Sequence, residues 1–223
     1  MKHQLLLVLI CVCLTVCLGA CRNDGPAAQE QEVEQEQDSI TVSQEEYLII
    51  PGRQVGRLQA TRCTVSDALE AYGSDARQDT IYLGEGIYDT GVVLYPDDPV
   101  KRVEIYWDTS LDTLRPTFIR INGGFGQKSL WHTPEGITIG TTLEEVETIN
   151  GKPFKIWGFG WDYGGVVNSW EGGSLPETLG LTFAPTVEDV PEYLLGEVEL
   201  PSNQAALKAV KPVVVSVVCS FRE

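Results

Sequence analysis

Short apolar runs separated by short turns are the feature that most constrains how this chain can fold. The runs span residues 81–83, 92–95, 103–107, 118–121 and 213–221 and are rich in β-branched and aromatic residues. Such runs are typical of strands, and Gly, Pro, Asn and Asp mark turns between the first four. Connections this short join antiparallel strands, because a parallel pair needs a crossover of about a dozen residues. The sequence therefore predicts a mostly antiparallel sheet.

Two segments, 64–72 and 141–149, carry their apolar residues on one helical face. Each starts at a threonine that can cap a helix and ends close to a glycine. The capping box of the second is either Thr141 with Glu144 or Thr142 with Glu145. Weaker helical patterns cover 187–195 and 204–210. We therefore expect an α+β fold, a mostly antiparallel sheet with a few short helices.

The two clearer helices have matching surroundings. A valine or isoleucine near a glycine precedes each helix, and a glycine followed by strand-like residues comes after it. This match predicts an internal duplication of a helix–β-meander unit, with repeats covering residues 47–125 and 132–223. Both repeats belong to one predicted domain, residues 47–223.

The second helix and its flanks carry a family resemblance. Residues 136–159 read "GITIGTTLEEVETINGKPFKIWGF". This pattern is similar to that of bacterial envelope lipoproteins with β-lactamase-inhibitor-protein-like or barrel-assembly-lipoprotein-like repeats. The resemblance implies helix-on-sheet layers and a protein-binding or envelope-binding role. It transfers no catalytic residue to this chain.

The first twenty residues predict a signal peptide. Lys2 precedes an apolar run over residues 5–18, which is shorter than the roughly 18–20 residues that span a bilayer. The run ends in Leu18-Gly19-Ala20-Cys21, which resembles the lipobox of bacterial lipoproteins. That resemblance implies cleavage before Cys21, fatty acylation of this cysteine and attachment to the cell envelope. We expect the outer membrane, with the periplasmic and surface leaflets both open; the alternative is a plain secretory signal with a chance cysteine.

The segment 21–46 is strongly acidic. It holds eight acids, one base and no aromatic residue, so it cannot bury enough apolar surface to fold. We expect a disordered tether between the lipidated cysteine and the domain. The domain itself has 14 basic and 24 acidic residues, a net charge of −10, which argues against binding nucleic acid or anionic lipid.

Two cysteines remain beyond the signal peptide and Cys21. These are Cys63 and Cys219, which are far apart in the sequence. In an oxidising compartment they could form a disulfide, or they could be two buried thiols that behave as small apolar residues. The sequence leaves both alternatives open.

Few residues in the mature chain could support catalysis. His132 is its one histidine, so a site with several histidines is excluded, and we expect no metal or cofactor. Neither a nucleophile elbow nor a phosphate-binding loop is present. Glycoside hydrolysis needs only two carboxylates, and Asp108, Asp162 and Glu171 lie beside tryptophans. A glycan-hydrolysing protein therefore stays as an alternative.

The stretch "KIWGFGWDYGGVVNSW", residues 155–170, is the best candidate for a binding surface. If it is an extended hairpin, alternation places all of its first four aromatic residues on one face and two glycines on the other. If the turn is Gly164-Gly165, Trp170 lies opposite Phe159; if it is Tyr163-Gly164, Trp170 lies opposite Trp157. In both cases we expect the preceding helix to cover the glycine face. We expect another layer to bury most of this aromatic row, and the alternative is a binding surface formed by part of the row and its polar rim. The candidate binding residues are Trp157, Trp161, Asp162, Tyr163, Asn168, Trp170 and Glu171.

These features predict a lipid-anchored envelope protein that acts as a non-catalytic binding or structural module. Its expected contacts are the lipid bilayer, through acylated Cys21, and an envelope protein or glycan. The alternative is a glycan-binding or glycan-hydrolysing lipoprotein that uses the aromatic hairpin between Trp157 and Trp170.

Overall fold

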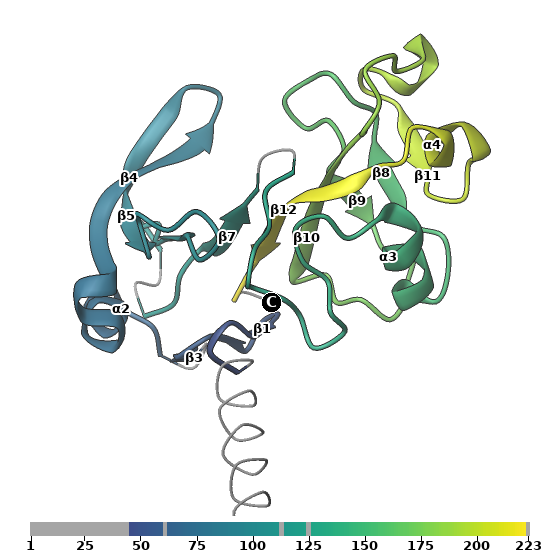
Figure 1. Cartoon of the computed structure of the whole chain (residues 1–223). Coiled ribbons are helices and arrows are strands. Elements are labelled where there is room, and N and C mark those ends of the chain that lie inside the picture. The colour runs from purple at the N-terminus through teal and green to yellow at the C-terminus, as the bar shows by residue number, and fades with distance from the viewer. Residues whose placement is uncertain (1–44, 60–61, 112–113, 124–125, 222–223) are drawn as a thin grey trace, which may run out of the picture. The chain divides into compact units, whose positions relative to one another are not determined.

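A computed structural model describes residues 45–59, 62–111, 114–123 and 126–221 (Figure 1). These residues form three α-helices and twelve strands in three antiparallel sheets, so the predicted α+β class is confirmed. The predicted signal peptide, the predicted lipidation site Cys21 and residues 22–44 of the predicted tether lie outside the described residues.

The largest sheet has six strands in the order β10-β12-β7-β6-β5-β4. These strands are β4 (Ala76–Gly84), β5 (Ile87–Leu94), β6 (Val103–Tyr106), β7 (Phe118–Asn122), β10 (Leu179–Ala184) and β12 (Val213–Cys219). All five predicted apolar runs fall in or overlap these strands. Strand β12 lies between β7 and β10, so it joins the meander β4–β7 to the later part of the chain (Figure 1).

Two three-stranded sheets complete the fold. One contains β1 (Ile49–Ile50), β2 (Gln54–Val55) and β3 (Leu58–Gln59); the other contains β8 (Lys155–Trp157), β9 (Val167–Ser169) and β11 (Glu199–Pro201). The first long helix is followed by four strands that are successive neighbours. The second is followed by the hairpin β8–β9, which pairs with β11 in a separate sheet. The two halves of the domain therefore have different strand topologies.

Capping fixes the starts of the two long helices. Helix α2 (Val65–Tyr72) has a capping box between Thr64 and Asp67. Helix α3 (Leu143–Asn150) uses Thr142 with Glu145, the second of the two predicted capping boxes. It ends at Gly151, which has a left-handed φ of 76° that glycine adopts at little cost.

The two weaker helix predictions had different outcomes. Helix α4 (Ala205–Ala209) lies within the predicted segment 204–210. The helix predicted over 187–195 is wrong, because only the short 3-10 helix η2 (Glu192–Leu194) forms there. Pro191 explains the difference, since proline disfavours helical backbone at the residue before it.

The buried tryptophans tie loops to the core through their indole N–H groups. The bonds run from Trp107 Nε1 to Cys63 O (2.7 Å), from Trp131 Nε1 to Lys101 O (2.7 Å) and from Trp170 Nε1 to Leu179 O (3.0 Å). Leaving such a donor unpaired in the interior costs about 1–3 kcal/mol. Each of these rings therefore fixes a specific backbone carbonyl as well as filling volume.

The folded domain includes the last residues of the predicted tether. The Glu46 carboxylate lies 2.7 Å from Arg57 Nη2 and accepts a hydrogen bond of 3.1 Å from the Tyr95 hydroxyl. Burial and the neighbouring Glu46 raise the pKa of Tyr95. Composition alone placed Glu46 in the tether because acidic residues continue up to it.

Cys63 and Cys219 are both buried free thiols. The structure therefore does not form the disulfide that the sequence left open. Burial raises the pKa of each thiol to about 12, so very little thiolate is present at neutral pH.

In the folded protein we expect neither Cys63 nor Cys219 to react with Ellman's reagent, because burial withholds the thiolate. Unfolding in guanidinium without a reductant should expose both, so these two thiols should then react. If no thiol reacted until a reductant was added, the two cysteines would be paired and the structural assignment would be wrong.

Candidate functional site

The predicted aromatic hairpin is shorter than expected. Its paired part ends at Trp157, and the register pairs Lys155 with Ser169 and Ile156 with Val167. Both predicted registers are therefore wrong. The reason is that Phe159 leaves β9: its N–H donates to Leu194 O (2.8 Å), and its carbonyl accepts from Gly196 N (2.8 Å).

We call residues 158–166 the aromatic loop. Its tight turn spans Trp161 to Gly164, closed by a 2.9 Å hydrogen bond from Gly164 N to Trp161 O. Gly165 lies against β10 instead of forming a hairpin turn. Its φ is +75°, and a Cβ at this position would lie 1.9 Å from Phe183 O. Glycine is required here for close approach of two backbones.

The glycine face of the loop is also covered differently from expectation. A Cβ at Gly158 would meet Gly196 O at 2.6 Å, a Val198 methyl at 2.7 Å and Leu194 O at 2.9 Å. The segment that contains η2 therefore packs on Gly158, while the exposed Gly160 meets only the Leu195 side chain, and the prediction that the preceding helix α3 covers both glycines is wrong. Nothing in the helical pattern of 141–149 indicated that a later segment would pack there.

The aromatic side chains do not share one face. Phe159 and Trp170 are buried, whereas Tyr163 is 50% exposed. Trp161 connects the half-buried Trp157 to Tyr163, because its ring centroid lies 6.0 Å and 5.3 Å from theirs, both in edge-to-face geometry. The predicted aromatic face is therefore wrong beyond Trp157.

Trp170 does lie against an aromatic ring, but the partner differs from the two predicted ones. Its ring centroid is 5.1 Å from that of Phe154. The observed pairing of Lys155 with Ser169 brings these two residues opposite each other. Because Trp170 is only 2% exposed, it is a core residue and leaves the set of candidate binding residues.

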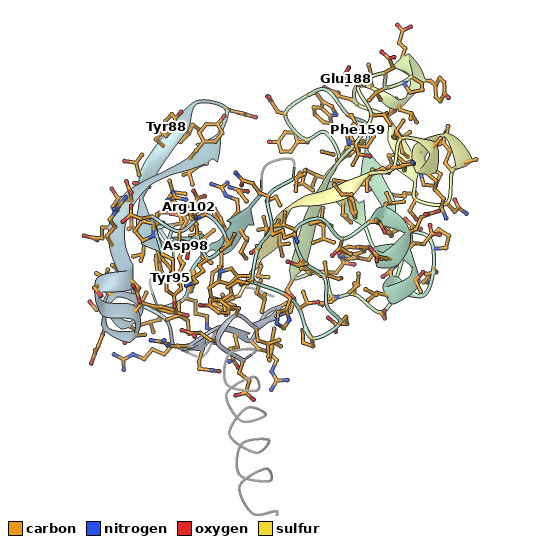
Figure 2. The ribbon with its side chains drawn as sticks, viewed as in Figure 1. Tyr88, Tyr95, Asp98, Arg102, Phe159 and Glu188 are labelled. Atoms are coloured by element: carbon orange, nitrogen blue, oxygen red, sulfur yellow. The ribbon has the colours of Figure 1, made fainter. Side chains whose placement is uncertain are left out.

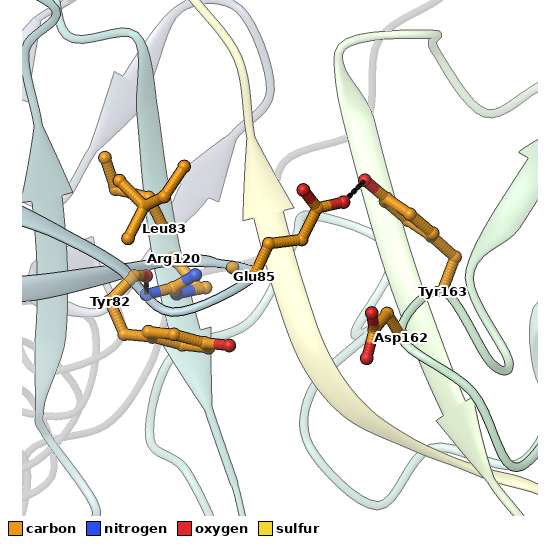
Figure 3. Close-up of a pocket in the computed structure, with 8 residues that line it drawn as sticks. Tyr82, Leu83, Glu85, Arg120, Asp162 and Tyr163 are labelled. Atoms are coloured by element: carbon orange, nitrogen blue, oxygen red, sulfur yellow. Dashed lines mark hydrogen bonds between the residues drawn. The ribbon is translucent and has the colours of Figure 1, made fainter.

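A pocket of about 540 Å³ opens beside the aromatic loop, and we call it the tip pocket (Figure 3). Its lining residues are Tyr82, Leu83, Gly84, Glu85, Ile87, Arg120, Asp162 and Tyr163. Most of them come from the tip of the β4–β5 hairpin, one comes from β7 and two come from the aromatic loop. The volume is in the range of small-ligand and side-chain binding sites.

The hairpin tip and the aromatic loop are in contact across this pocket. The Tyr163 hydroxyl donates a hydrogen bond of 3.4 Å to Glu85 Oε1, which is 78 residues away in the sequence (Figure 3). Glu85 and Gly86 form the two-residue turn, with φ values of +50° and +78°. A positive φ is uncommon for a non-glycine residue, and here it is part of the tight turn that carries the Glu85 side chain.

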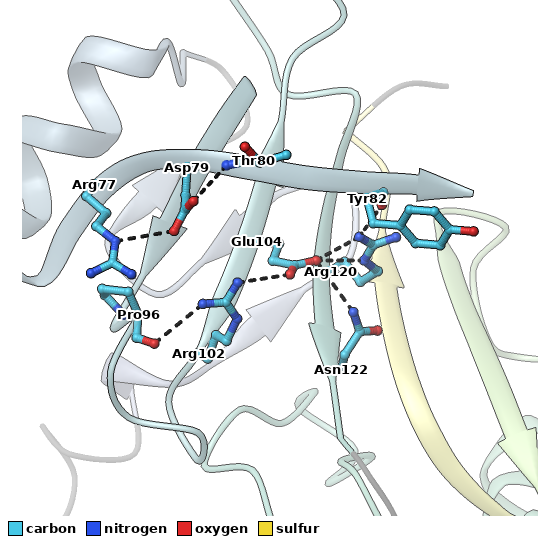
Figure 4. A network of polar contacts seen from close by, with 9 residues as sticks. All are labelled: Arg77, Asp79, Thr80, Tyr82, Pro96, Arg102, Glu104, Arg120 and Asn122. Atoms are coloured by element: carbon cyan, nitrogen blue, oxygen red, sulfur yellow. Dashed lines mark hydrogen bonds and ion pairs between the residues drawn. The ribbon is translucent and has the colours of Figure 1, made fainter. Parts of the chain in front are cut away.

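A polar network on the sheet holds the base of the tip pocket (Figure 4). Arg120 Nε and Nη2 lie 3.0 Å and 2.7 Å from Glu104 Oε2, and Nη2 also donates to Tyr82 O at 2.6 Å. The other Glu104 oxygen accepts from Arg102 Nη2 at 3.2 Å. The bond to Tyr82 ties β4 to β7, which is not its neighbour in the sheet.

The rim of the tip pocket is rich in exposed apolar surface. Tyr82 is 46% exposed, Ile87 58%, Tyr88 64% and Tyr163 50%. The Tyr82 and Tyr88 rings lie 5.1 Å apart across the β4–β5 hairpin. Several large exposed side chains in one place are typical of an interaction surface, whereas scattered single ones are not informative.

The aromatic loop also lines a second pocket, of about 420 Å³. Its walls are Phe159, Gly160, Trp161, Gly164, Phe183, Ala184, Pro185, Glu188, Val190 and Leu195. Phe159 and Glu188, which are labelled in Figure 2, lie in the part of the domain that contains β8 and β9. Trp161 therefore lines this pocket, while Asp162 and Tyr163 line the tip pocket.

The remaining predicted binding residues lie in neither pocket. Asn168 donates to Glu199 Oε1 at 2.9 Å. Glu171 accepts from Ser169 and lies 3.5 Å from Lys155 Nζ, and these contacts lower its pKa. Both residues stabilise the surface of the small sheet that contains β8 and β9.

The sequence reasoning missed the first-half wall of the tip pocket, which includes Tyr82, Glu85, Ile87 and Arg120. The sequence places Tyr82 and Arg120 in predicted strands and Glu85 in a turn, and it assigns Ile87 to no element. The positively charged Arg120 within an apolar strand was the one local signal that could have indicated a polar site on the sheet. The distance in sequence to Asp162 and Tyr163 hid the rest.

The three carboxylates and the histidine that the sequence singled out have different surroundings. The Asp108 carboxylate accepts from Ser110, so Asp108, Asp162 and Glu171 have three different settings. His132 Nδ1 contacts the carbonyl of Thr133 at 3.0 Å. Within the described ranges, no group of three His, Cys, Asp or Glu side chains could hold a metal ion.

No helix among the described residues has the length and apolarity needed to cross a membrane. Comparisons of the chain with protein-family models, curated proteins and solved structures find no match. Any functional assignment therefore depends on the geometry and chemistry of the site.

Gly165→Ala should destabilise the domain by about 2 kcal/mol more than Gly151→Ala. Both glycines have nearly the same φ, +75° and +76°, so both substitutions carry the left-handed backbone cost of about 1–2 kcal/mol. Only at Gly165 would the new methyl group overlap another backbone, and such overpacking costs about 1–3 kcal/mol. Urea unfolding of the two variants measures the difference; equal losses would show that the loop does not approach β10 this closely.

Proposed function

We propose that this protein is a lipid-anchored, non-catalytic binding module of the bacterial cell envelope. Its binding site is the tip pocket together with the exposed side of the aromatic loop. The observation that carries the proposal is that Glu85 meets Asp162 and Tyr163 at one open pocket, although Glu85 is 78 residues away from Tyr163 in the sequence.

The character of the surface favours a protein partner. Tyrosines and an isoleucine line the rim, and aromatic residues are enriched in the cores of protein interfaces. The site is at a hairpin tip and a loop, the kind of position from which binding residues are commonly presented. The resemblance to envelope lipoproteins with binding roles points in the same direction.

Non-catalytic binding is favoured by the state of the reactive groups. Both free thiols are buried with a pKa of about 12, which leaves them poor nucleophiles. The one histidine of the mature chain is half-buried beside a backbone carbonyl. Glu85 and Asp162 line the tip pocket, and their carboxylates can act there as hydrogen-bond acceptors for a bound partner without any catalytic step.

The anchor is the part of the proposal that the described residues do not include. The lipobox-like Leu18-Gly19-Ala20-Cys21 supports acylation of Cys21, and the acidic segment that precedes the folded domain supports a tether that lifts the domain from the membrane. The acidic charge of the domain is consistent with attachment through acyl chains in place of electrostatic binding to anionic lipid.

A glycan ligand is the second candidate. The exposed Tyr82 and Tyr163 rings lie beside the carboxylates of Glu85 and Asp162, and such a combination of flat apolar surface and acceptors also suits a sugar. Trp161, at the second pocket, would extend the same surface.

A photo-reactive benzoylphenylalanine at position 163 should form a discrete crosslink to an envelope protein when the full chain is expressed in its host. The same amino acid at position 177, an exposed glutamate in the β9–β10 connection, should not. The two positions share the anchor and the domain, so the comparison isolates the site. Immunoblotting and mass spectrometry of the adduct give the measurement.

Equal crosslinking at both positions, or none at position 163, would reject the protein-binding proposal. Binding of the detergent-solubilised full chain to a glycan array would favour the second candidate, provided that Trp161→Ala and Tyr163→Ala abolished it. Glycan cleavage that depended on Asp162 would contradict the non-catalytic assignment.

Cys21→Ala should move the protein from the membrane fraction to the soluble fraction and abolish labelling by an alkyne fatty acid. Each acyl methylene contributes about 0.8 kcal/mol to membrane binding, so the anchor is lost when no chain can be attached. Cys17→Ala removes a cysteine of the signal segment and should leave both readouts unchanged. Continued labelling of the Cys21→Ala protein would exclude this cysteine as the lipidation site.

A further inference from the structure

We propose that the tip pocket binds one arginine or lysine side chain of the protein partner. This inference rests on the proposed function and goes beyond it by naming the chemistry that the partner presents. It follows from the charges, the apolar walls and the single weak contact across the pocket.

The pocket carries two carboxylates that form no ion pair within the part of the chain that the structure describes. Glu85 comes from the hairpin tip and Asp162 from the aromatic loop (Figure 3). Among the described residues, the Asp162 side chain has no hydrogen bond or ion pair, and Glu85 has only the long contact to the Tyr163 hydroxyl. Two acceptors on separate walls are suited to a ligand with several N–H donors, such as a guanidinium group.

Among the described residues that line the pocket, Arg120 is the one cation, and its guanidinium is already hydrogen-bonded. Arg120 directs Nε and Nη2 to Glu104 and shares Nη2 with the Tyr82 carbonyl, and its side chain is only 18% exposed (Figure 4). These bonds hold the guanidinium at the base of the pocket. It is therefore not free to move to Glu85 or Asp162 and neutralise them.

The walls suit the rest of a long basic side chain. Tyr82, Ile87 and Tyr163 present aromatic rings and a branched aliphatic group that are about half exposed. The aliphatic stem of arginine or lysine packs on such surfaces while its charged end reaches polar groups. A tyrosine ring can also attract the cation through its face.

The contact that closes the pocket is weak enough for a ligand to replace. The Tyr163 hydroxyl and Glu85 Oε1 are 3.4 Å apart, at the outer limit of a hydrogen bond, and Tyr163 is half exposed. A charged donor bound to Glu85 would form a shorter and stronger bond than this neutral hydroxyl. The Tyr163 ring, and not its hydroxyl, is then the part that contributes to binding.

The test compares a short peptide containing arginine with the same peptide containing citrulline, the neutral isostere. The protein is the full mature chain with Cys21→Ala, which is free of lipid, and amide chemical shifts report binding. The arginine peptide should shift the amides of residues 82–87 and 162–163, and citrulline should weaken binding at least about tenfold. Binding should also weaken as the salt concentration rises.

Variants assign the roles of individual groups. Glu85→Gln and Asp162→Asn should each weaken binding about three- to tenfold. The matched control Glu177→Gln removes the same charge at an exposed position outside the pocket and should have no comparable effect. Tyr163→Phe should bind at least as tightly as the natural chain, whereas Tyr163→Ala should bind more weakly.

The inference is overturned if arginine and citrulline peptides bind equally, if neither shifts these amides at millimolar concentration, or if Glu177→Gln is as harmful as Glu85→Gln. Its failure is distinguishable from failure of the proposed function. A crosslinked partner at position 163 without arginine binding would retain the binding module and reject this ligand. Arginine binding without a crosslinked partner would retain the cation-binding pocket and reject the protein-binding proposal.

Discussion

The structure depends on the pairing of β12 with strands on both of its sides. One edge of β12 pairs with β7, through contacts such as Val217 with Ile121, and the other pairs with β10, through Val217 with Leu181. Without it, the meander β4–β7 and the strand β10 would each keep an unpaired edge. The two differently organised halves of the chain share one buried core because this strand lies between them.

Features that depend on neighbouring residues could be predicted from the sequence. The five apolar runs form strands, and threonine caps mark the starts of α2 and α3. The β4–β5 turn follows from Gly84 and Gly86 on either side of Glu85. In each case the signal and the structure lie within a few residues of each other, so local propensity was sufficient.

Features that depend on distant residues could not be predicted. Alternation along 155–170 assumed that the strand continues, but Phe159 pairs with the backbone of Leu194 and Gly196. Gly158, one of the two glycines that looked like a bare strand face, makes room for this approach instead. Strand periodicity says nothing about a partner that arrives from a later segment, because the same residues satisfy both arrangements until that partner is known.

The candidate site has the same limit. Asp162 and Tyr163 were singled out because they belong to an aromatic stretch, and they do line the tip pocket. Glu85 gave no comparable signal, since an acid between two glycines is an ordinary turn. Only the sheet brings it to Tyr163, and no spacing rule predicts a contact across 78 residues.

The position of the tip pocket has a mechanical consequence. Its walls stand on opposite sides of β12, since Glu85 belongs to the meander that ends at β7 and Tyr163 belongs to the segment that leads to β10. The twist of the sheet between β7 and β10 therefore sets how far apart the walls lie. A ligand that bridges Glu85 and Asp162 would restrain that twist and stiffen β12, so slower amide exchange in the buried strand would report occupancy at a distance from the pocket.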